Sequence, residues 1–313
     1  MSDAYVAYGV CVAHGTHSRL GAFVRTALAA ACMALGFSTA HADGPALPHN
    51  DGADGVLRVC ADPNNMPLSN DKGEGFENKI AAQMASDFGY KIEYTYFPQR
   101  MGFIRHTLRE KIPDTEDYKC DLVIGVPKGY DMTSTTRPWL HSTYAMVFPN
   151  RPEFASINTP SDLLKLPPDQ LHKLRLGIFS NTPAVDWLLG NNLIEQAVSY
   201  KVQSGDPAEF PGEMIQRDMS AGNVDVVFLW GPIAGYFAKQ AGDKVKLVAF
   251  PPTPGVRFDY EISMGVRYGE GAWKTKIDQW IGANQAKIDK ILTSYEVPLL
   301  AISESSAAQA NAK

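Results

Sequence analysis

A pattern of strand, helix, strand, helix and strand occurs twice in this 313-residue chain, in residues 56–126 and 174–229. Parallel strands need a long crossover connection, which is usually a helix, so this alternation is typical of parallel α/β sheets. We therefore expect a two-lobed α/β fold with one parallel sheet in each lobe. The expected strands are 57–61, 91–97, 121–126, 174–179, 198–202, 224–229, 245–250 and 261–266. The expected helices are 77–89, 101–111, 183–191, 211–221, 231–241 and 273–295.

Two Pro-rich stretches, 148–152 and 251–254, fall where the chain would cross between the lobes. They predict a first lobe of residues 56–148 plus 255–302 and a second lobe of residues 149–254. Residues 43–55 and 303–313 have no apolar periodicity, so we interpret them as a flexible leader and a flexible tail.

Residues 1–42 have the features of a cleaved secretory signal. Arg19 and Arg25 accompany an apolar run at 26–37, and Ala40-His41-Ala42 has the Ala-x-Ala form of a cleavage site. The run is shorter than the roughly 20 residues that a membrane-spanning helix needs. Lipoprotein processing at Cys32 is disfavoured because the residues before it lack the usual leucine. Residues 1–17 are long for a charged region, so the true start stays open.

Charge and cysteine content limit the classes of partner. Removal of residues 1–42 leaves a net charge near −6 without a run of one sign, which does not favour nucleic acid. An exported protein favours a bond between Cys60 and Cys120. If these residues end one strand and begin its parallel neighbour, however, their thiols lie ~13 Å apart, at ~3.3 Å per residue. Register therefore argues against the disulfide, and the pairing stays open. The spacing of histidines and cysteines predicts no metal site.

Polar turns follow several expected strands, where ligands of open parallel sheets bind. The first contains Asp62, Asn64, Asn65 and Asn70, whose side chains either bind a ligand or cap their own backbone. A later turn contains Pro127 and Tyr130, followed by Arg137 and Tyr144. In the second half, Asn181 and Thr182 precede a helix start at Pro183, where exposed amides can bind an anion. Together these residues predict a binding cleft between the lobes.

No catalytic pattern is present in the sequence. It contains no Gly-x-Ser-x-Gly elbow, His-Glu-x-x-His motif, phosphate-binding loop or dinucleotide fingerprint. We expect a protein that is not an enzyme and that carries no cofactor.

The chain resembles the two-lobed extracellular solute-binding proteins of the polar amino-acid type, from about residue 57 to 300. The resemblance is carried by LRVCADPNNMPLS, GFENKIAAQMASDFGYKIEYTY, CDLVIGV and GNVDVVFLWGPIAGY. It is similar in more detail to the solute-binding-like proteins associated with pyrroloquinoline-quinone-dependent methanol dehydrogenase. The matching motifs are Cys60-Ala61-Asp62-Pro63-Asn64-Asn65-x-Pro67, Gly75-Phe76-Glu77-Asn78, Gln99-Arg100-x-Gly102-Phe103, Cys120-Asp121, Gly125-Val126-Pro127-x-Gly129-Tyr130, Thr136-Arg137-Pro138, Ser142-Thr143-Tyr144 and Trp230-Gly231-Pro232.

The resemblance implies a periplasmic accessory of methanol oxidation that assists maturation or activation of the dehydrogenase. The implied partner is the catalytic subunit, in its calcium or lanthanide form, with the cytochrome also open. Two departures from amino-acid binders agree with this reading. The spacing of their carboxylate-binding arginine leads to Ser134, and their amine-binding aspartate corresponds to Trp230. A zwitterion needs a partner for each buried charge, so the cleft should bind a free amino acid poorly.

The candidate cleft residues are therefore joined by Gln99, Arg100 and Trp230. An aromatic residue with arginines nearby suits either a protein hot spot or a planar acidic ligand such as the quinone. The alternative function is a substrate-binding receptor of an ABC transporter, which predicts tight solute binding with hinge closure.

Overall fold

The computed structural model describes residues 54–201, 212 and 214–302. The predicted signal and tail lie outside the described residues, as do most of the leader and part of the helix predicted at 211–221. No helix in the described ranges is long and apolar enough to cross a membrane.

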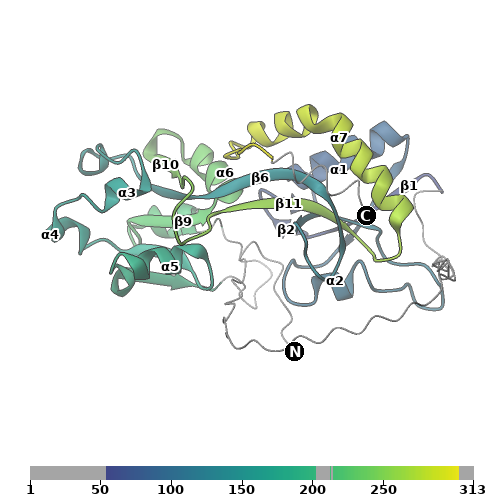
Figure 1. Cartoon of the computed structure of the whole chain (residues 1–313), viewed down its shortest axis with the longest axis horizontal. Coiled ribbons are helices and arrows are strands. Elements are labelled where there is room, and N and C mark those ends of the chain that lie inside the picture. The colour runs from purple at the N-terminus through teal and green to yellow at the C-terminus, as the bar shows by residue number, and fades with distance from the viewer. Residues whose placement is uncertain (1–53, 202–211, 213, 303–313) are drawn as a thin grey trace, which may run out of the picture.

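The first lobe is built on a mixed sheet (Figure 1). β1 (Val56–Ala61) pairs in parallel with β4 (Lys91–Tyr96) and β5 (Leu122–Pro127). β11 (Asp259–Val266) returns from the C-terminal part of the chain and pairs antiparallel with β5 and β6 (Ser134–Pro149). A polar turn after β1 forms a small hairpin of two-residue strands, β2 (Asn64–Asn65) and β3 (Ser69–Asn70).

β6 runs through both lobes. Beyond its pairing with β11, it pairs with β9 (Val226–Trp230) on one edge and β10 (Val245–Ala249) on the other. β7 (Leu176–Phe179) and β8 (Ala197–Tyr200) continue the sheet beyond β9 in parallel. The two lobes therefore share one nine-stranded sheet of order β4-β1-β5-β11-β6-β9-β7-β8, with β10 also on β6.

Long helices cover one face of the first lobe's sheet. α1 (Phe76–Phe88) begins after Gly75, and its C-terminal cap is Gly89, which adopts the left-handed conformation that glycine favours. α7 (Gly271–Ser294) packs beside α1 and along β6. The second lobe has α5 (Pro183–Gly190) and α6 (Gly231–Ala241). The short helical elements are α2 (Phe103–His106), η1 (Pro152–Phe154), α3 (Pro160–Leu163), α4 (Pro168–Leu171), η2 (Ile194–Gln196), the π-helix η3 (Met214–Met219) and η4 (Gly242–Lys244).

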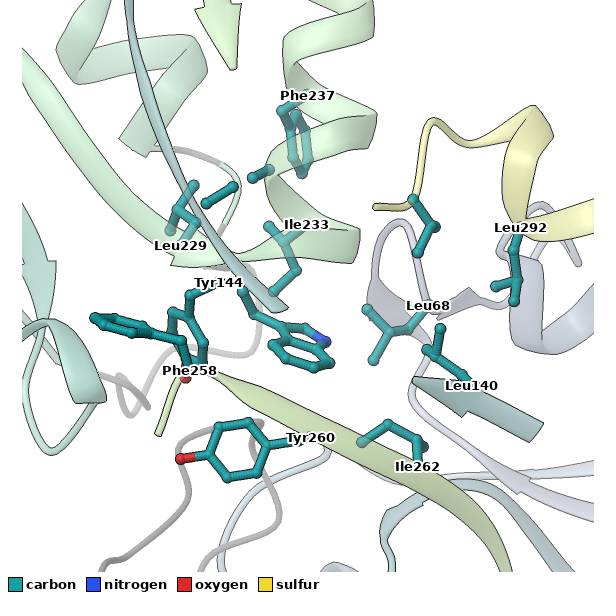
Figure 2. Close-up of a cluster of buried hydrophobic side chains, with 14 of the residues drawn as sticks. Leu68, Leu140, Tyr144, Leu229, Ile233, Phe237, Phe258, Tyr260, Ile262 and Leu292 are labelled. Atoms are coloured by element: carbon teal, nitrogen blue, oxygen red, sulfur yellow. The ribbon is translucent and has the colours of Figure 1, made fainter. Parts of the chain in front are cut away.

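A large, continuous hydrophobic core extends through both lobes (Figure 2). Successive strand residues point to opposite faces, so Leu57 and Val59 of β1 join this core, as do Leu176 and Phe228 of the second lobe. Cys60 points to the other face, where a smaller core lies beneath α2. The continuity of the larger core ties the two lobes together at the level of packing.

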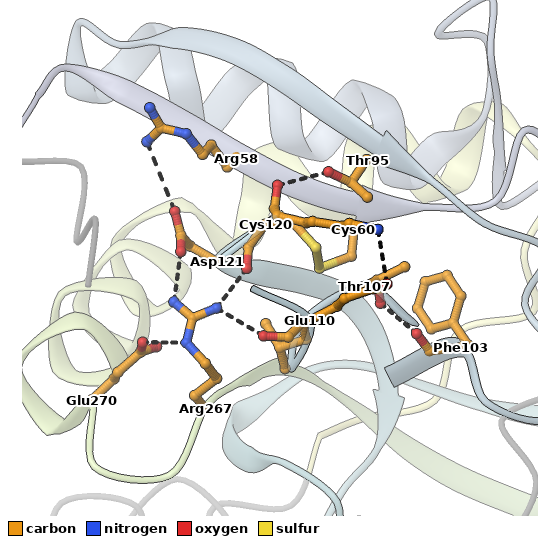
Figure 3. The surroundings of a disulfide bond; sticks show 12 residues. Arg58, Cys60, Thr95, Phe103, Thr107, Glu110, Cys120, Asp121, Arg267 and Glu270 are labelled. Atoms are coloured by element: carbon orange, nitrogen blue, oxygen red, sulfur yellow. Dashed lines mark hydrogen bonds and ion pairs between the residues drawn. A yellow bond between two sulfur atoms is a disulfide. The ribbon is translucent and has the colours of Figure 1, made fainter. Parts of the chain in front are cut away.

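The structure contains the Cys60–Cys120 disulfide, with 5.4 Å between the Cα atoms (Figure 3). The register argument against this bond is wrong because it extends β5 back through Cys120. β5 begins at Leu122, and the chain bends at Asp121. The bend brings Cys120 across the face of the sheet towards Cys60, which an extended strand could not do.

Arg267 holds this bend in place (Figure 3). Its buried guanidinium donates to the carbonyl oxygen of Cys120 at 2.5 Å and to Asp121 Oδ1 at 2.6 Å. It also donates to Glu270 Oε1 at 2.5 Å and lies over the ring of Tyr118. Burial is the main cause that raises the pKa of Asp121, and the Arg267 guanidinium opposes the rise.

Three further expectations needed revision. Most predicted strands and long helices are present within one or two residues, but β6 was not predicted. The residues of β6 are buried at most positions on both faces, so the strand lacks the alternation of a half-exposed strand. The predicted helix at 101–111 shrinks to the single turn of α2. The described part of the helix predicted at 211–221 is the π-helix η3. The residue boundaries of the lobes stay a prediction.

Candidate functional site

The junction between the lobes collects the carboxyl ends of strands from both sides. β5 runs parallel to β6, because both are antiparallel to β11. β9 runs antiparallel to β6, and its last residue, Trp230, pairs with Tyr144. β5 in the first lobe and β9 in the second therefore both end at the junction, which is where the predicted binding residues were expected.

The turn after β1 is folded on itself. Asp62 Oδ1 accepts from the backbone N of Asn64 at 2.8 Å, and Oδ2 accepts from the backbone N of Gln99 at 2.5 Å. Asn65 Nδ2 donates to Gln99 Oε1 at 3.0 Å. The structure thus joins the β1 turn to the turn after β4.

Burial is the main cause that raises the pKa of Asp62, against the two backbone donors and the positive charge of Arg100. Asp62 is 9% exposed, so its carboxyl group is largely shielded from water near the junction. Arg100 itself is half-buried in the turn after β4.

The Asn70 side chain also forms hydrogen bonds within its own turn. Its Oδ1 accepts from the backbone N of Glu74, and its Nδ2 donates to Glu74 Oε2, both at 2.8 Å. Asn78 Oδ1 accepts from the backbone N atoms of Asn70 and Gly75. Of the two uses open to this polar turn, capping of its own backbone is therefore observed for Asp62 and Asn70.

The remaining candidates lie at separate places. Pro127 ends β5, and Tyr130 packs at the margin of the small core under α2. Arg137 lies beside α7, where its backbone N donates to Asp278 Oδ1 at 2.6 Å. Thr182 is the residue before α5 and its Oγ1 donates to the Phe179 carbonyl, whereas Asn181 is exposed with a φ of 60°. Tyr130 N donates to the Pro127 carbonyl at 3.0 Å. The roles of these five residues in binding stay predictions.

Aromatic side chains fill the middle of the junction (Figure 2). Tyr144 and Trp230 are 2% and 3% exposed, and their ring centroids lie 5.5 Å apart. Tyr260 packs against both, and Phe258 stacks on Phe250. Burial raises the pKa of Tyr144 far above its usual value and raises that of Tyr260 to about 12. Trp230 is thus part of the core at the junction.

Sequence reasoning missed the C-terminal contribution to the junction. Residues 295–301 cross from α7 to β6, where Leu300 N donates to the His141 carbonyl at 2.9 Å. A sequence signal existed in Gly231 and Gly235, because small residues four apart on a helix allow close backbone approach. A Cβ on Gly235 would lie 1.9 Å from the Glu296 carbonyl oxygen.

Comparison with known proteins identifies the family. No protein-family model matches the chain. The crystal structure of the periplasmic binding protein XoxJ from Methylobacterium extorquens AM1 is 34% identical, with a TM-score of 0.62, over 79% of this chain and 100% of that chain. The chain belongs to the same family of periplasmic binding proteins as XoxJ.

One further relative and one solved structure of similar fold are informative. Protein MoxJ of Methylorubrum extorquens is 26% identical over 293 residues, which cover 89% of this chain and 93% of MoxJ. An ancestral cationic amino-acid solute-binding protein is 19% identical with a TM-score of 0.58, over 78% of this chain and 96% of that one. The second likeness shows the fold alone, and confirms the two-lobed solute-binding architecture expected from the sequence.

Proposed function

We propose that this member of the XoxJ family is a periplasmic accessory protein of methanol oxidation that assists maturation or activation of a pyrroloquinoline-quinone-dependent methanol dehydrogenase. The observation that carries the proposal is the aromatic filling of the junction. Trp230 stands where the resemblance places the amine-binding aspartate of amino-acid binders, and it is buried between Tyr144 and Tyr260.

The charged anchors of an amino-acid site are missing from their expected positions. The position that holds the carboxylate-binding arginine in amino-acid binders is Ser134 in this chain. Ser134 pairs with Val266 at the end of β6 remote from the junction. Arg137 lies beside α7. A buried zwitterion without a partner for each charge is strongly disfavoured, because it loses its hydration. These placements support loss of amino-acid binding in this chain.

A junction filled by packed side chains supports a docking role better than solute delivery. Delivery by a two-lobed receptor uses closure around a hinge. Here β6 passes through both lobes and one core fills the junction. Movement of the lobes would expose Tyr144 and Trp230 to water, at a cost of about 25 cal/mol per Å² of apolar area. A pre-formed surface loses little conformational entropy when another protein binds it.

The proposed partner is the catalytic subunit of the dehydrogenase, in its calcium or lanthanide form, and the cytochrome is a second candidate. Gln99, Arg100, Tyr130 and Asn181 are only partly buried or exposed, which suits contact with a protein. We propose no catalytic activity and no bound cofactor for the chain.

Native mass spectrometry of the mature protein, released gently from the periplasm of its host during growth on methanol, tests the proposal. We expect a complex with the dehydrogenase subunit. A deletion strain should also contain dehydrogenase of lower specific activity per mole of subunit, and the wild-type gene should restore it.

The Trp230→Phe variant keeps an aromatic ring in the core and tests whether that filling is sufficient for the accessory role. It should restore dehydrogenase activity in the deletion strain. A monomer carrying an adduct of a few hundred daltons, with normal dehydrogenase in the deletion strain, would instead support a transport receptor.

A further inference from the structure

The segment 295–301, here called the C-terminal strap, is attached to the first lobe at both of its ends. Tyr295 packs on Phe76 of α1, with 5.8 Å between ring centroids, and its hydroxyl donates to the carbonyl of Glu74. Further along, Ser142 Oγ donates to the Pro298 carbonyl at 2.6 Å. Leu299 forms an antiparallel bridge with Ser142, so the strap continues the sheet along one edge of β6.

The same strap packs closely against α6 of the second lobe. A Cβ on Gly231 would lie 2.2 Å from the Thr143 carbonyl oxygen and 3.2 Å from Pro298 Cγ, and Gly235 meets the Glu296 carbonyl oxygen. Lys239 Nζ donates to the carbonyl of Ser294 at 2.8 Å, and the ring of Tyr236 stacks on Tyr295. The strap therefore connects the lobes at a point separate from the aromatic cluster.

His141 fastens the last part of the strap. Its Nδ1 lies 2.6 Å from the carbonyl oxygen of Ala301, and its Nε2 lies 2.9 Å from Asp259 Oδ2 on β11. Both partners are acceptors when Asp259 is ionised. Neutral imidazole carries only one N–H, so the two contacts together require one additional proton, on the ring or on the carboxyl group.

We propose that His141 and Asp259 form a proton-dependent latch that holds the C-terminal strap against β6 and α6. This inference does not depend on the proposed role in methanol oxidation. Other charges around the pair are Glu261, which faces His141 across the β6–β11 pairing and binds Lys128 at 2.9 Å, and Arg257, whose Nε donates to the Asp259 carbonyl. Glu261 is thus partly neutralised by Lys128, and Arg257 binds the backbone of Asp259.

The sign of the pH effect follows from linkage. The closed latch holds one proton that the open latch releases more readily, so closure is favoured at low pH and weakens as pH rises. One linked proton changes the equilibrium constant by at most tenfold per pH unit.

Hydrogen–deuterium exchange of the mature protein between pH 5.5 and 8.5, corrected for intrinsic exchange rates, tests the latch. We expect protection of residues 296–302 to fall about tenfold over this range, with a smaller fall in α6. Protection of β1, remote from the strap, should stay constant. His141→Gln should lower the protection at pH 5.5 by about tenfold and abolish its pH dependence. His106→Gln, at an exposed position of α2, should match wild type.

Asp259→Asn distinguishes a latch from simple packing. The asparagine amide can donate to Nε2, which leaves Nδ1–H free to donate to Ala301 without the additional proton. This variant should keep the strap protected at pH 8.5. Wild-type protection that does not change with pH would overturn the proposal. A pH dependence of strap protection that persists in His141→Gln would also overturn it. The same holds if the pH dependence in Asp259→Asn equals that of wild type.

Discussion

Replacement of Gly235 by alanine should destabilise the protein through the contact between α6 and the C-terminal strap. The new Cβ would lie 1.9 Å from the Glu296 carbonyl oxygen, and real Cβ atoms essentially never approach closer than 3.0 Å. The helix and the strap must therefore move apart by about 1.1 Å. Both groups belong to the backbone, so no side-chain rotation relieves the clash.

The expected loss combines two opposing effects. Overpacking of a buried site costs about 1–3 kcal/mol, and a clash between backbones lies at the upper end. Alanine in place of glycine inside a helix stabilises the folded protein by up to about 1 kcal/mol. We expect a net loss of about 2 kcal/mol in the free energy of unfolding, or roughly 4–8 °C in Tm for a protein of this size.

Urea denaturation followed by circular dichroism measures this change, with Gly282→Ala as the matched control. Gly282 lies inside α7, and its Cβ would meet only the flexible end of the Arg137 side chain. The control should be neutral or more stable by up to about 1 kcal/mol. A Gly235→Ala protein as stable as wild type would refute the assigned packing of α6 against the strap.

Two other perturbations have expected outcomes. The disulfide joins residues 60 positions apart, so loop-closure entropy predicts that the Cys60→Ser/Cys120→Ser protein loses about 4 kcal/mol; a thermal scan matching wild type would contradict this. Lys165, aided by the backbone N atoms of Asn158 and Thr159, lowers the pKa of Asp162 well below its usual value. The ion pair between Asp162 and Lys165 stabilises the fold above about pH 4 and is lost as pH falls. The Asp162→Asn protein should therefore be less stable than wild type at neutral pH, and it should lose less stability than wild type between pH 5 and 2. Equal urea midpoints for Asp162→Asn and wild type at pH 7 would contradict that assignment.

The polar turns after β1 and β4 were predicted from the sequence in position but not in the contacts they make. Their positions after parallel strands followed from the strand and helix pattern, and the structure connects Asp62, Asn65 and Gln99 by hydrogen bonds. Whether those polar atoms face a ligand or their own backbone depends on the partner each one meets. The capping of the Glu74 backbone N–H by the Asn70 side chain was therefore one of two uses that the sequence allowed.

Apolar periodicity by itself determined the two-lobed α/β class, most strands and all the long helices, because these elements depend on contacts between residues close in the chain. Tertiary structure alone decided the features that join distant segments. The bend at Asp121 depends on Arg267, 146 residues away, and it brings Cys120 to Cys60. β6 stays extended through both lobes because other strands occupy its two edges. The junction around Trp230 and the C-terminal strap exists only when β6, α6 and the chain after α7 are packed together. Gly231 and Gly235 indicate a close approach to α6, but no local pattern specifies which segment makes it.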